Sequence, residues 1–342
     1  RLHEEQVRDA REYVTLAESR NGKIPAPVGW DYVWGDVLAE LESAPLAARI
    51  VNLETSITAS DDYWVGKAVH YRMHPRNVAC LGAARIDCCS LANNHVLDWG
   101  RGGLLETLET LRAAGMATAG AGRDLAEAAA PAILPCEGGG RLLVFAFASP
   151  TSGVPLEWAA TPERAGVNLL REPLEHAAAL VGAQVERVKK PGDVVIASIH
   201  WGGNWGYAIP REQRRLAHAL LDAGVDLVHG HSSHHPKGFE VHRGKLVLYG
   251  CGDFLDDYEG IEGYEAYRDD LVLMYLPSVD AARGTLLELR LVPLRIERFR
   301  LTRPSRADAR WLTEVMAREC KAFGIALRVE EDGSLAACWK PA

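Results

Sequence analysis

The segment DVVIASIHWGGNWGY (193–207) joins an apolar strand pattern to a polar, glycine-rich turn, and it indicates the class of fold. Residues 194–199 are only Val, Ile, Ala and Ser, which is typical of a strand that is buried on both faces. His200 ends this strand, and the glycines that follow let the backbone approach a ligand closely. Because ligands bind at the carboxyl ends of strands in α/β folds, His200 is a candidate functional residue.

Six further β-branched or apolar runs alternate with helical patterns along the chain. They are ARIVNLE (48–54), RIDCCSLA (85–92), MATAGA (116–121), RLLVFAFA (141–148), VDLVHG (225–230) and KLVLYG (245–250). Leucines at helical spacing fill 104–111 and precede Gly115, and a similar pattern over 216–223 precedes Gly224. This alternation predicts an α/β protein. From about residue 269 the strands follow one another, so we expect a mixed sheet, then a helix over 307–323 and a final strand at ALRVEE.

The composition favours one large globular domain over 1–342, with its core at about 30–325. No apolar run approaches the roughly 20 residues that span a bilayer. The net charge is -8 and the basic residues are scattered, so we expect no nucleic-acid partner. The seven cysteines are odd in number and lack CxxC spacing, which predicts reduced thiols and a cytoplasmic location. Cys88 and Cys89 are expected in the core.

The sequence opens on RLHEEQVRDAREYVTLAE, a charged amphipathic helix pattern that has neither an initiator Met nor a strand before it. We therefore expect that a segment upstream of Arg1 has been removed or is not recorded in this sequence. That segment could include a signal or a membrane anchor, and membrane contact is expected only in that case.

Polar side chains follow two of the predicted strands directly. In VNLETSIT, Glu54 closes a strand, and a carboxylate there can bridge two cations, although a capping or surface role is equally compatible with the pattern. In SLANNHVLDWG, Asn94 offers a neutral oxygen ligand, His95 is a candidate general acid or base, and Asp98 can orient its ring. The alternative is that these amides cap the helix that starts near Gly102.

The densest group of histidines lies in VDLVHGHSSHHPKGFE (225–240), which holds four of them. Of the 12 histidines in the chain, seven fall between His200 and His242. Imidazole is the commonest ligand of transition-metal sites, so this segment predicts metal binding, with a surface or pH-sensing cluster as the alternative. Trp205 and Tyr207 could line a pocket beside it, although aromatic residues in such loops more often serve packing.

Taken in order, the segments VNLE, LANNH, IHWG, GHSSH and YGCGDF resemble the CapA family of poly-gamma-glutamate capsule proteins over about residues 30–325. The resemblance implies the calcineurin-like metallophosphoesterase fold, a two-sheet mixed β-sandwich flanked by helices. It also implies two divalent metal ions of the Mn, Fe or Zn class. Glu54 would bridge the two ions. His234 would help to hold one of them, and the other would be held by Asn94, His200 and His231. His95, backed by Asp98, would protonate the leaving group or stabilise the transition state.

Three departures from the family pattern set limits on this transfer. The family's first metal ligand is an Asp at the end of an N-terminal strand, and that strand is apparently missing here. Gly35-Asp36 is not a substitute, because it falls inside a helical pattern, YVWGDVLAEL. Asn204 stands where relatives often have Glu, and Asp253 replaces an Asn. These two changes indicate altered substrate contacts, so Asn204 and Asp253 join Trp205 and Tyr207 as predicted substrate-binding residues.

The function that we expect from this pattern is a dinuclear phosphoesterase in which a metal-bound hydroxide attacks a phosphoryl centre. The expected substrate is an anionic small molecule or a glutamate polymer. One alternative is an amide-bond hydrolase or transferase that acts on a gamma-glutamyl substrate. Another is a non-catalytic accessory or binding protein of poly-gamma-glutamate or capsule assembly.

Overall fold

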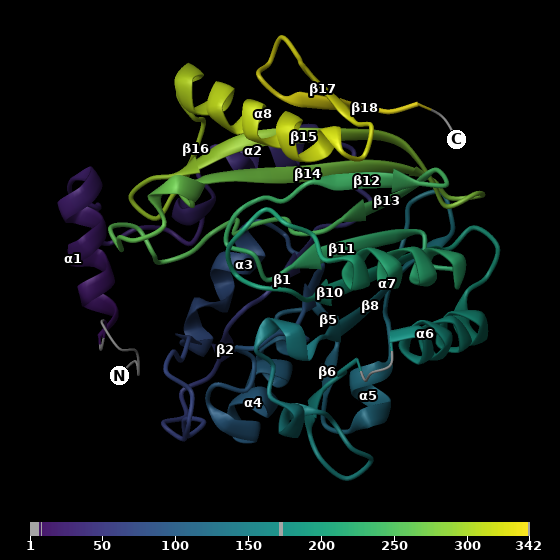
Figure 1. Ribbon diagram of the computed structural model, residues 1–342. Coiled ribbons are helices and arrows are strands. Elements are labelled where there is room, and N and C mark those ends of the chain that lie inside the picture. Colours follow the sequence, from purple (N-terminus) through teal and green to yellow (C-terminus); the bar gives the residue numbers. More distant parts are fainter. Residues whose placement is uncertain (1–6, 8, 171–173, 341–342) are drawn as a thin grey trace.

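A six-stranded mixed sheet forms the centre of the computed structural model, which describes residues 7, 9–170 and 174–340 (Figure 1). Its strand order is β12-β13-β11-β10-β8-β7. The strands are β7 (Ala132–Pro135), β8 (Arg141–Ala148), β10 (Val194–His200), β11 (Leu227–His231), β12 (Phe239–His242) and β13 (Lys245–Leu248). The inner four strands are parallel, and β7 and β12 run antiparallel at the two edges. In this register His200 lies opposite His231, so both end at the same edge of the sheet.

The two faces of this sheet bury different sets of side chains, because successive residues of a strand point to opposite faces. Leu143, Phe145 and Val195 belong to the cluster that packs under α6 (Leu174–Val188) and α7 (Arg211–Asp222). Val144 and Ile196, one position along the same strands, belong to the main core on the other face. Helices therefore cover the outer face, and the inner face packs on a second β-layer (Figure 1).

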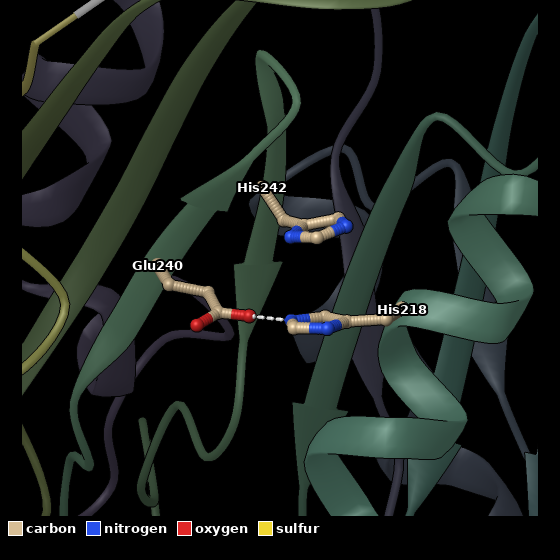
Figure 2. Close-up of side chains that lie close together, drawn as sticks. All are labelled: His218, Glu240 and His242. Atoms are coloured by element: carbon tan, nitrogen blue, oxygen red, sulfur yellow. Dashed lines mark hydrogen bonds and ion pairs between the residues drawn. The ribbon is translucent and has the colours of Figure 1, made fainter. Parts of the chain in front are cut away.

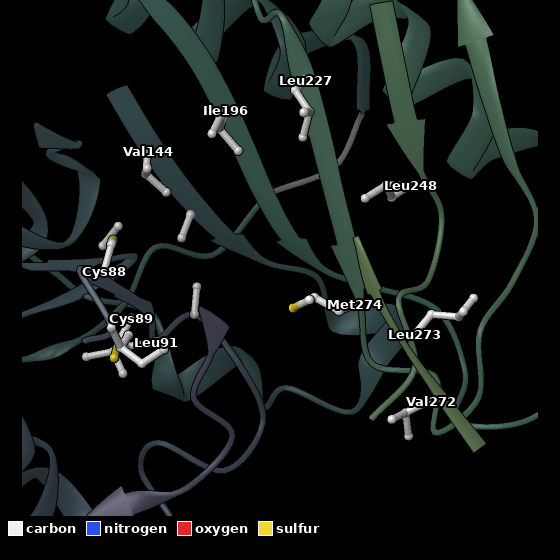
Figure 3. Packing of buried hydrophobic residues seen from close by; sticks show 14 of the residues in the cluster. Cys88, Cys89, Leu91, Val144, Ile196, Leu227, Leu248, Val272, Leu273 and Met274 are labelled. Atoms are coloured by element: carbon white, nitrogen blue, oxygen red, sulfur yellow. The ribbon is translucent and has the colours of Figure 1, made fainter. Parts of the chain in front are cut away.

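The second layer contains two sheets. One is a parallel three-stranded sheet of β1 (Ile50–Asn52), β4 (Cys88–Ser90) and β5 (Ala117–Ala119). The other is antiparallel and consists of β14 (Leu271–Asp280), β15 (Thr285–Ile296), β16 (Leu301–Thr302), β17 (Ala326–Val329) and β18 (Leu335–Cys338). Figure 3 shows Cys88 and Met274 of this layer around the same core as Val144, Ile196 and Leu227 of the central sheet. The prediction of an α/β fold with mixed, layered sheets between helices is confirmed.

The remaining elements connect and cover these sheets. Two-stranded ladders join β2 (Ser56–Ile57) to β3 (Arg72–Met73) and β6 (Ala121–Gly122) to β9 (Gly166–Val167). The other α-helices are α1 (Ala10–Asn21), α2 (Val37–Ser43), α3 (Ala79–Ala83), α4 (Gly100–Ala113), α5 (Leu125–Ala129) and α8 (Arg306–Lys321). The 3-10 turns are η1 (Tyr32–Trp34), η2 (Pro75–Val78), η3 (Pro150–Ser152), η4 (Leu156–Trp158) and η5 (Glu265–Tyr267). The helix expected over 307–323 is thus confirmed as α8.

Two local predictions were wrong. The helical pattern across Gly35-Asp36 is interrupted, because Gly35 has a φ of 46° and separates η1 from α2. A Cβ at this position would clash with the carbonyl oxygen of Leu301, so the chain turns tightly here. Asp36 is the residue before α2, and its carboxylate accepts a hydrogen bond of 2.9 Å from the Arg303 amide. The strand at ALRVEE is not the last one either, since β18 follows it and pairs with both β15 and β17.

The remaining structural predictions have simple outcomes. The amphipathic pattern at the start gives α1 from Ala10 onward, and the expected helix over residues 1–6 and at residue 8 lies outside the described residues. All seven cysteines are free thiols, and Cys88 and Cys89 are fully buried in β4 as expected. Within the described ranges no helix is both long and apolar enough to cross a membrane.

Candidate functional site

The candidate site forms where two parallel strand pairs end. Asn52 of β1 lies opposite Ser90 of β4, so the segments that follow these strands and carry Glu54 and Asn94 emerge together. The Asn93 amide fixes this arrangement, because it donates to Leu53 O at 2.9 Å and to the side-chain oxygen of Asn52 at 3.1 Å. The β10–β11 pair ends at His200 and His231. Strand register thus aligns the segments within each pair, and packing of the two sheets brings the two pairs together, with Asn94 in contact with His200.

Three predicted metal ligands meet around one nitrogen atom. Nε2 of His200 lies 3.0 Å from Oδ1 of Asn94 and 3.6 Å from Oε1 of Glu54. Ligand atoms that share a transition-metal ion lie roughly 3.0–3.5 Å apart, because each is about 2.0–2.2 Å from the metal. The first distance lies in this range and the second is just above it, so a small shift of the Glu54 side chain would let a carboxylate, an amide oxygen and an imidazole hold a single ion. The amide is essential to this group, since no three His, Cys, Asp or Glu ligand atoms of this site in the described chain lie within 4.8 Å of one another.

His231 contacts the opposite side of the His200 ring. The two Nδ1 atoms are 2.9 Å apart, and Nε2 of His231 lies 3.0 Å from the Ser198 hydroxyl. Ser198 also contacts Nδ1 of His229 at 3.0 Å. In this arrangement His231 orients His200, while Asn94 and Glu54 face its other nitrogen. The role of His231 as a metal ligand stays a prediction.

Burial determines the protonation states of these groups. Desolvation lowers the pKa of His200 and of His231 well below the ordinary histidine value, so both rings are neutral near pH 7. Neutral imidazole is the form that binds metals. Burial also raises the pKa of Glu54 to about 7, because ionising a carboxylate away from water is costly. A bound cation would offset that cost.

His234 is held by two of the residues that we predicted to contact substrate. Its Nδ1 lies 2.9 Å from the Asp253 carboxylate, and its Nε2 lies 3.1 Å from the Asn204 amide. Burial alone would lower its pKa, but the interaction with Asp253 outweighs burial, with help from Glu54, and the pKa rises to about 9. Asn204 and Asp253 therefore contact His234 directly, and substrate contact by either stays a prediction.

His95 and Asp98 form a buried pair beside these ligands. Nδ1 of His95 donates to the Asp98 carboxylate at 2.6 Å, and the Tyr71 ring stacks on the imidazole with centroids 3.8 Å apart. Asp98 is also bound by the Tyr71 amide at 2.8 Å and by the ammonium group of Lys67. Burial lowers the pKa of His95 to about 4, more than the nearby Asp98 raises it. Because Nδ1 carries the proton, Nε2 is left as the nitrogen that can exchange one.

Lys67 was missed by the sequence analysis. It lies in the loop between β2 and β3, where no strand end or histidine pattern marks it. Its ammonium group pairs with Asp98, donates to the Asn94 carbonyl oxygen and lies 3.5 Å from Nδ1 of His95. Burial lowers the pKa of Lys67, whereas Asp98 raises it. The position of the lysine is visible only once the chain has folded.

An aromatic cluster adjoins His234 and includes both predicted aromatic residues. Trp205 stacks on Tyr264 with centroids 3.9 Å apart and planes 4° from parallel, and it also contacts His234. Tyr207 contacts Tyr267 and His235. Tyr264 and Tyr267 come from a loop some sixty residues further along the chain, and no sequence pattern predicts their contact with Trp205 or Tyr207. These rings form an apolar wall on the His234 side of the site.

Comparison with known proteins identifies the family. The chain matches bacterial capsule synthesis protein PGA_cap over residues 2–258. It is 48% identical over 335 residues to a Mycobacterium tuberculosis protein named probable polyglutamine synthesis accessory protein, covering 98% of this chain and 88% of that protein. It is 28% identical over 225 residues to the PGA biosynthesis protein CapA of Bacillus subtilis, covering 66% and 56% of the two chains. It is also 26% identical over 276 residues to the capsule biosynthesis protein CapA of Bacillus anthracis, covering 79% and 62%. The chain therefore belongs to the PGA_cap family of bacterial capsule synthesis proteins, within the calcineurin-like superfamily.

Proposed function

We propose that this protein is a metal-dependent hydrolase that acts in the synthesis of a glutamate polymer or capsule. The biological setting rests on the family and on the names of its relatives, which refer to polyglutamine synthesis, PGA biosynthesis and capsule biosynthesis. The chemistry rests on the site. The substrate that we propose is an anionic small molecule or the glutamate polymer itself.

One observation carries the proposal of metal-dependent chemistry. Nε2 of His200, Oδ1 of Asn94 and Oε1 of Glu54 converge at separations that suit one shared ion. We propose that these residues hold one divalent ion of the Mn, Fe or Zn class, with His231 supporting His200. We also propose that Glu54 and His234 help to hold a second ion, which would displace the proton that Asp253 stabilises on His234. When bound, such ions polarise the scissile group and make water a better nucleophile.

The protein's own acid–base group is the His95–Asp98 pair. Asp98 holds the proton on Nδ1 and fixes the ring, so that Nε2 accepts or donates a proton at the reacting group. Lys67 and the Tyr71 amide keep the Asp98 carboxylate in position through its two oxygens. Stacking on Tyr71 restricts rotation of the imidazole and shields one of its faces from water.

The reaction type is proposed as phosphoester hydrolysis, because two cations stabilise the charge that develops on a phosphoryl group. Cleavage of a gamma-glutamyl amide bond is the alternative within the same site. The wall of Trp205, Tyr264 and Tyr267 offers apolar contact to the part of the substrate that does not react.

A metal and substrate screen tests the proposal. The full chain would be stripped of metal, reloaded with Mn²⁺, Fe²⁺ or Zn²⁺, and assayed with p-nitrophenyl phosphate, bis(p-nitrophenyl) phosphate and gamma-glutamyl p-nitroanilide. We expect turnover that requires metal and is lost in His95→Gln. Turnover that is equal in wild type and His95→Gln would exclude the acid–base pair as its source.

An accessory role without chemistry is the second candidate. The observation in its favour is the name of the mycobacterial relative, an accessory protein that is 48% identical to this chain. In that case the metal-loaded protein would turn over none of the three substrate classes but would still bind poly-gamma-glutamate, as measured by calorimetry.

A further inference from the structure

A second group of metal-ligand side chains lies on the outer face of the central sheet, separate from the candidate site. It consists of His218 on α7 and of Glu240 and His242 on β12 (Figure 2). One ligand atom from each residue lies within 4.8 Å of those of the other two. Among the described residues this is the one place where three His, Cys, Asp or Glu ligands meet so closely.

The strand period explains why the two β12 residues face α7. Glu240 and His242 are two positions apart, so they point to the same face, whereas Phe239 and Val241 point to the main core. Leu216 and Leu220 of α7 pack over this same outer face, which brings His218 to Glu240. Nε2 of His218 is hydrogen-bonded to Oε1 of Glu240.

The two imidazole rings lie one above the other on the same side of the carboxylate. The centroids of His218 and His242 are 3.7 Å apart, and their planes are 11° from parallel. Figure 2 shows a nitrogen of each ring directed toward the side on which Glu240 lies. An ion lies in the plane of each imidazole that binds it, so the rings must tilt toward each other when they share one. Both side chains are only half-buried, which leaves room for that tilt.

Partners outside the group hold the carboxylate in place. The Tyr249 hydroxyl donates to Oε1 of Glu240 at 2.9 Å, and Arg214 donates to Oε2 at 3.2 Å. Glu240 itself is buried, with 7% of its side chain exposed. Carboxylates that bind metals are commonly fixed by such outer hydrogen bonds, which set their orientation before the ion arrives.

We propose that His218, Glu240 and His242 bind one zinc-class divalent cation, with water completing its coordination. Two imidazoles and one carboxylate are a donor set that suits Zn²⁺ and its neighbours in the first transition row. The ion would cross-link α7 to the edge strand β12. Both elements begin just after loops of the candidate site, because α7 follows the Trp205 loop and β12 follows His234 and His235. This additional ion, separate from those of the candidate site, is therefore structural, and it holds two site-bearing segments together.

Metal counting on the full chain tests this proposal without using activity. Metal-free wild type and the variants His242→Gln and His218→Gln would be equilibrated with increasing Zn²⁺ by dialysis, and bound zinc would be measured by elemental analysis. The exposed His74 provides the control His74→Gln. We expect each site variant to bind one tight ion fewer than wild type and His74→Gln, with affinity at that site reduced about tenfold or more.

A second measurement locates the ion and does not depend on any variant. Wild-type crystals soaked in Zn²⁺ should give an anomalous peak between His218, Glu240 and His242, separate from any peak at His200. If both variants are folded by circular dichroism and bind as much zinc as wild type, or if no peak appears between these side chains, the proposal is wrong. The three residues would then be only a hydrogen-bonded contact between α7 and β12.

Discussion

His95 is the single residue whose geometry is most specific for chemistry. Its Nδ1 is fixed by Asp98 at 2.6 Å, and its neighbour Asn94 faces Nε2 of His200. We expect His95→Gln to lower turnover by about 10²-fold or more, because a positioned acid or base contributes on that scale. Bound metal should stay nearly unchanged, since Asn94, rather than His95, contacts Nε2 of His200.

The matched control for this prediction is His74→Gln, a histidine on the surface. Steady-state kinetics and elemental analysis of both proteins provide the comparison. Loss of metal from His95→Gln alone would mean that His95 is itself a ligand or is needed to hold Asn94.

Asp36 gives the opposite expectation at the residue scale. Its carboxylate accepts from the Arg303 amide at 2.9 Å and lies 3.8 Å from the Arg300 guanidinium, and it is 42% exposed. We expect Asp36→Asn to keep full metal content and activity and to change the free energy of unfolding by less than about 1 kcal/mol, as for other exposed ion pairs. A joint loss of metal and turnover would contradict this expectation.

At the scale of elements, α4 and β2 together support the loop that carries His95. The Ile57 amide of β2 donates to the Thr107 hydroxyl of α4 at 2.8 Å, and Thr107 is fully buried. The neighbouring Ser56 hydroxyl contacts the carbonyl oxygens of His95 and Val96 at 3.1 and 2.9 Å. The chain from α4 through β2 thus fixes the main chain of the acid–base pair.

Thr107→Val removes this link without changing side-chain shape. We expect the free energy of unfolding to fall by about 1–3 kcal/mol, because the buried Ile57 amide loses its partner. Thr110 lies on the same helix but is half-buried, so the free energy of unfolding should fall by much less in Thr110→Val. Urea denaturation of both variants measures the difference. Equal losses would show that the Ile57 contact is not what stabilises this region.

At the scale of the whole molecule, buried neutral histidines should make the metal-free protein sensitive to acid. Burial lowers the pKa of His95, His229 and His235 to about 4, whereas an unfolded histidine has a pKa of about 6.5. Between these values the unfolded chain takes up protons that the folded chain does not. The contribution of these histidines to the free energy of unfolding is therefore present above pH 6.5, and it is lost as the pH falls toward 4. Glu54, with a raised pKa of about 7, and Asp256, whose pKa burial raises well above its usual value, act in the opposite direction, so the contribution of the histidines is measured one residue at a time.

The variant His229→Asn isolates one of these groups, because Asn can keep the contact with Ser198. Between pH 7 and pH 5, one such histidine costs about 2 kcal/mol of stability. Urea titrations of the metal-free proteins should show a decrease that is smaller by about this amount in His229→Asn than in wild type. An identical pH dependence would mean that His229 is not neutral in the folded protein.

Local sequence patterns are enough to predict the α/β class, most strands of the two layers and the segments in which candidate site residues lie. These features are local: apolar runs form strands, and a polar residue directly after such a run lies at a strand end. His200, Glu54 and Asn94 could be selected in this way, and motif resemblance added His231 and His234. The helix predicted across Gly35 was wrong, because the break there comes from the close approach of Leu301 on a distant segment, which a local pattern does not contain.

Contacts between these side chains, in contrast, depend on how the whole chain folds. His200 and Asn94 are 106 positions apart and lie at or beyond the ends of strands of different sheets, and the packing of those sheets brings Nε2 within 3.0 Å of the amide oxygen. Lys67 reaches Asp98 from a loop without any pattern, and Tyr264 stacks on Trp205 from a remote segment. The His218, Glu240 and His242 group likewise exists only because α7 packs across β12. Distances between side chains depend on register and packing over the whole chain, whereas patterns in the sequence report only on neighbouring positions.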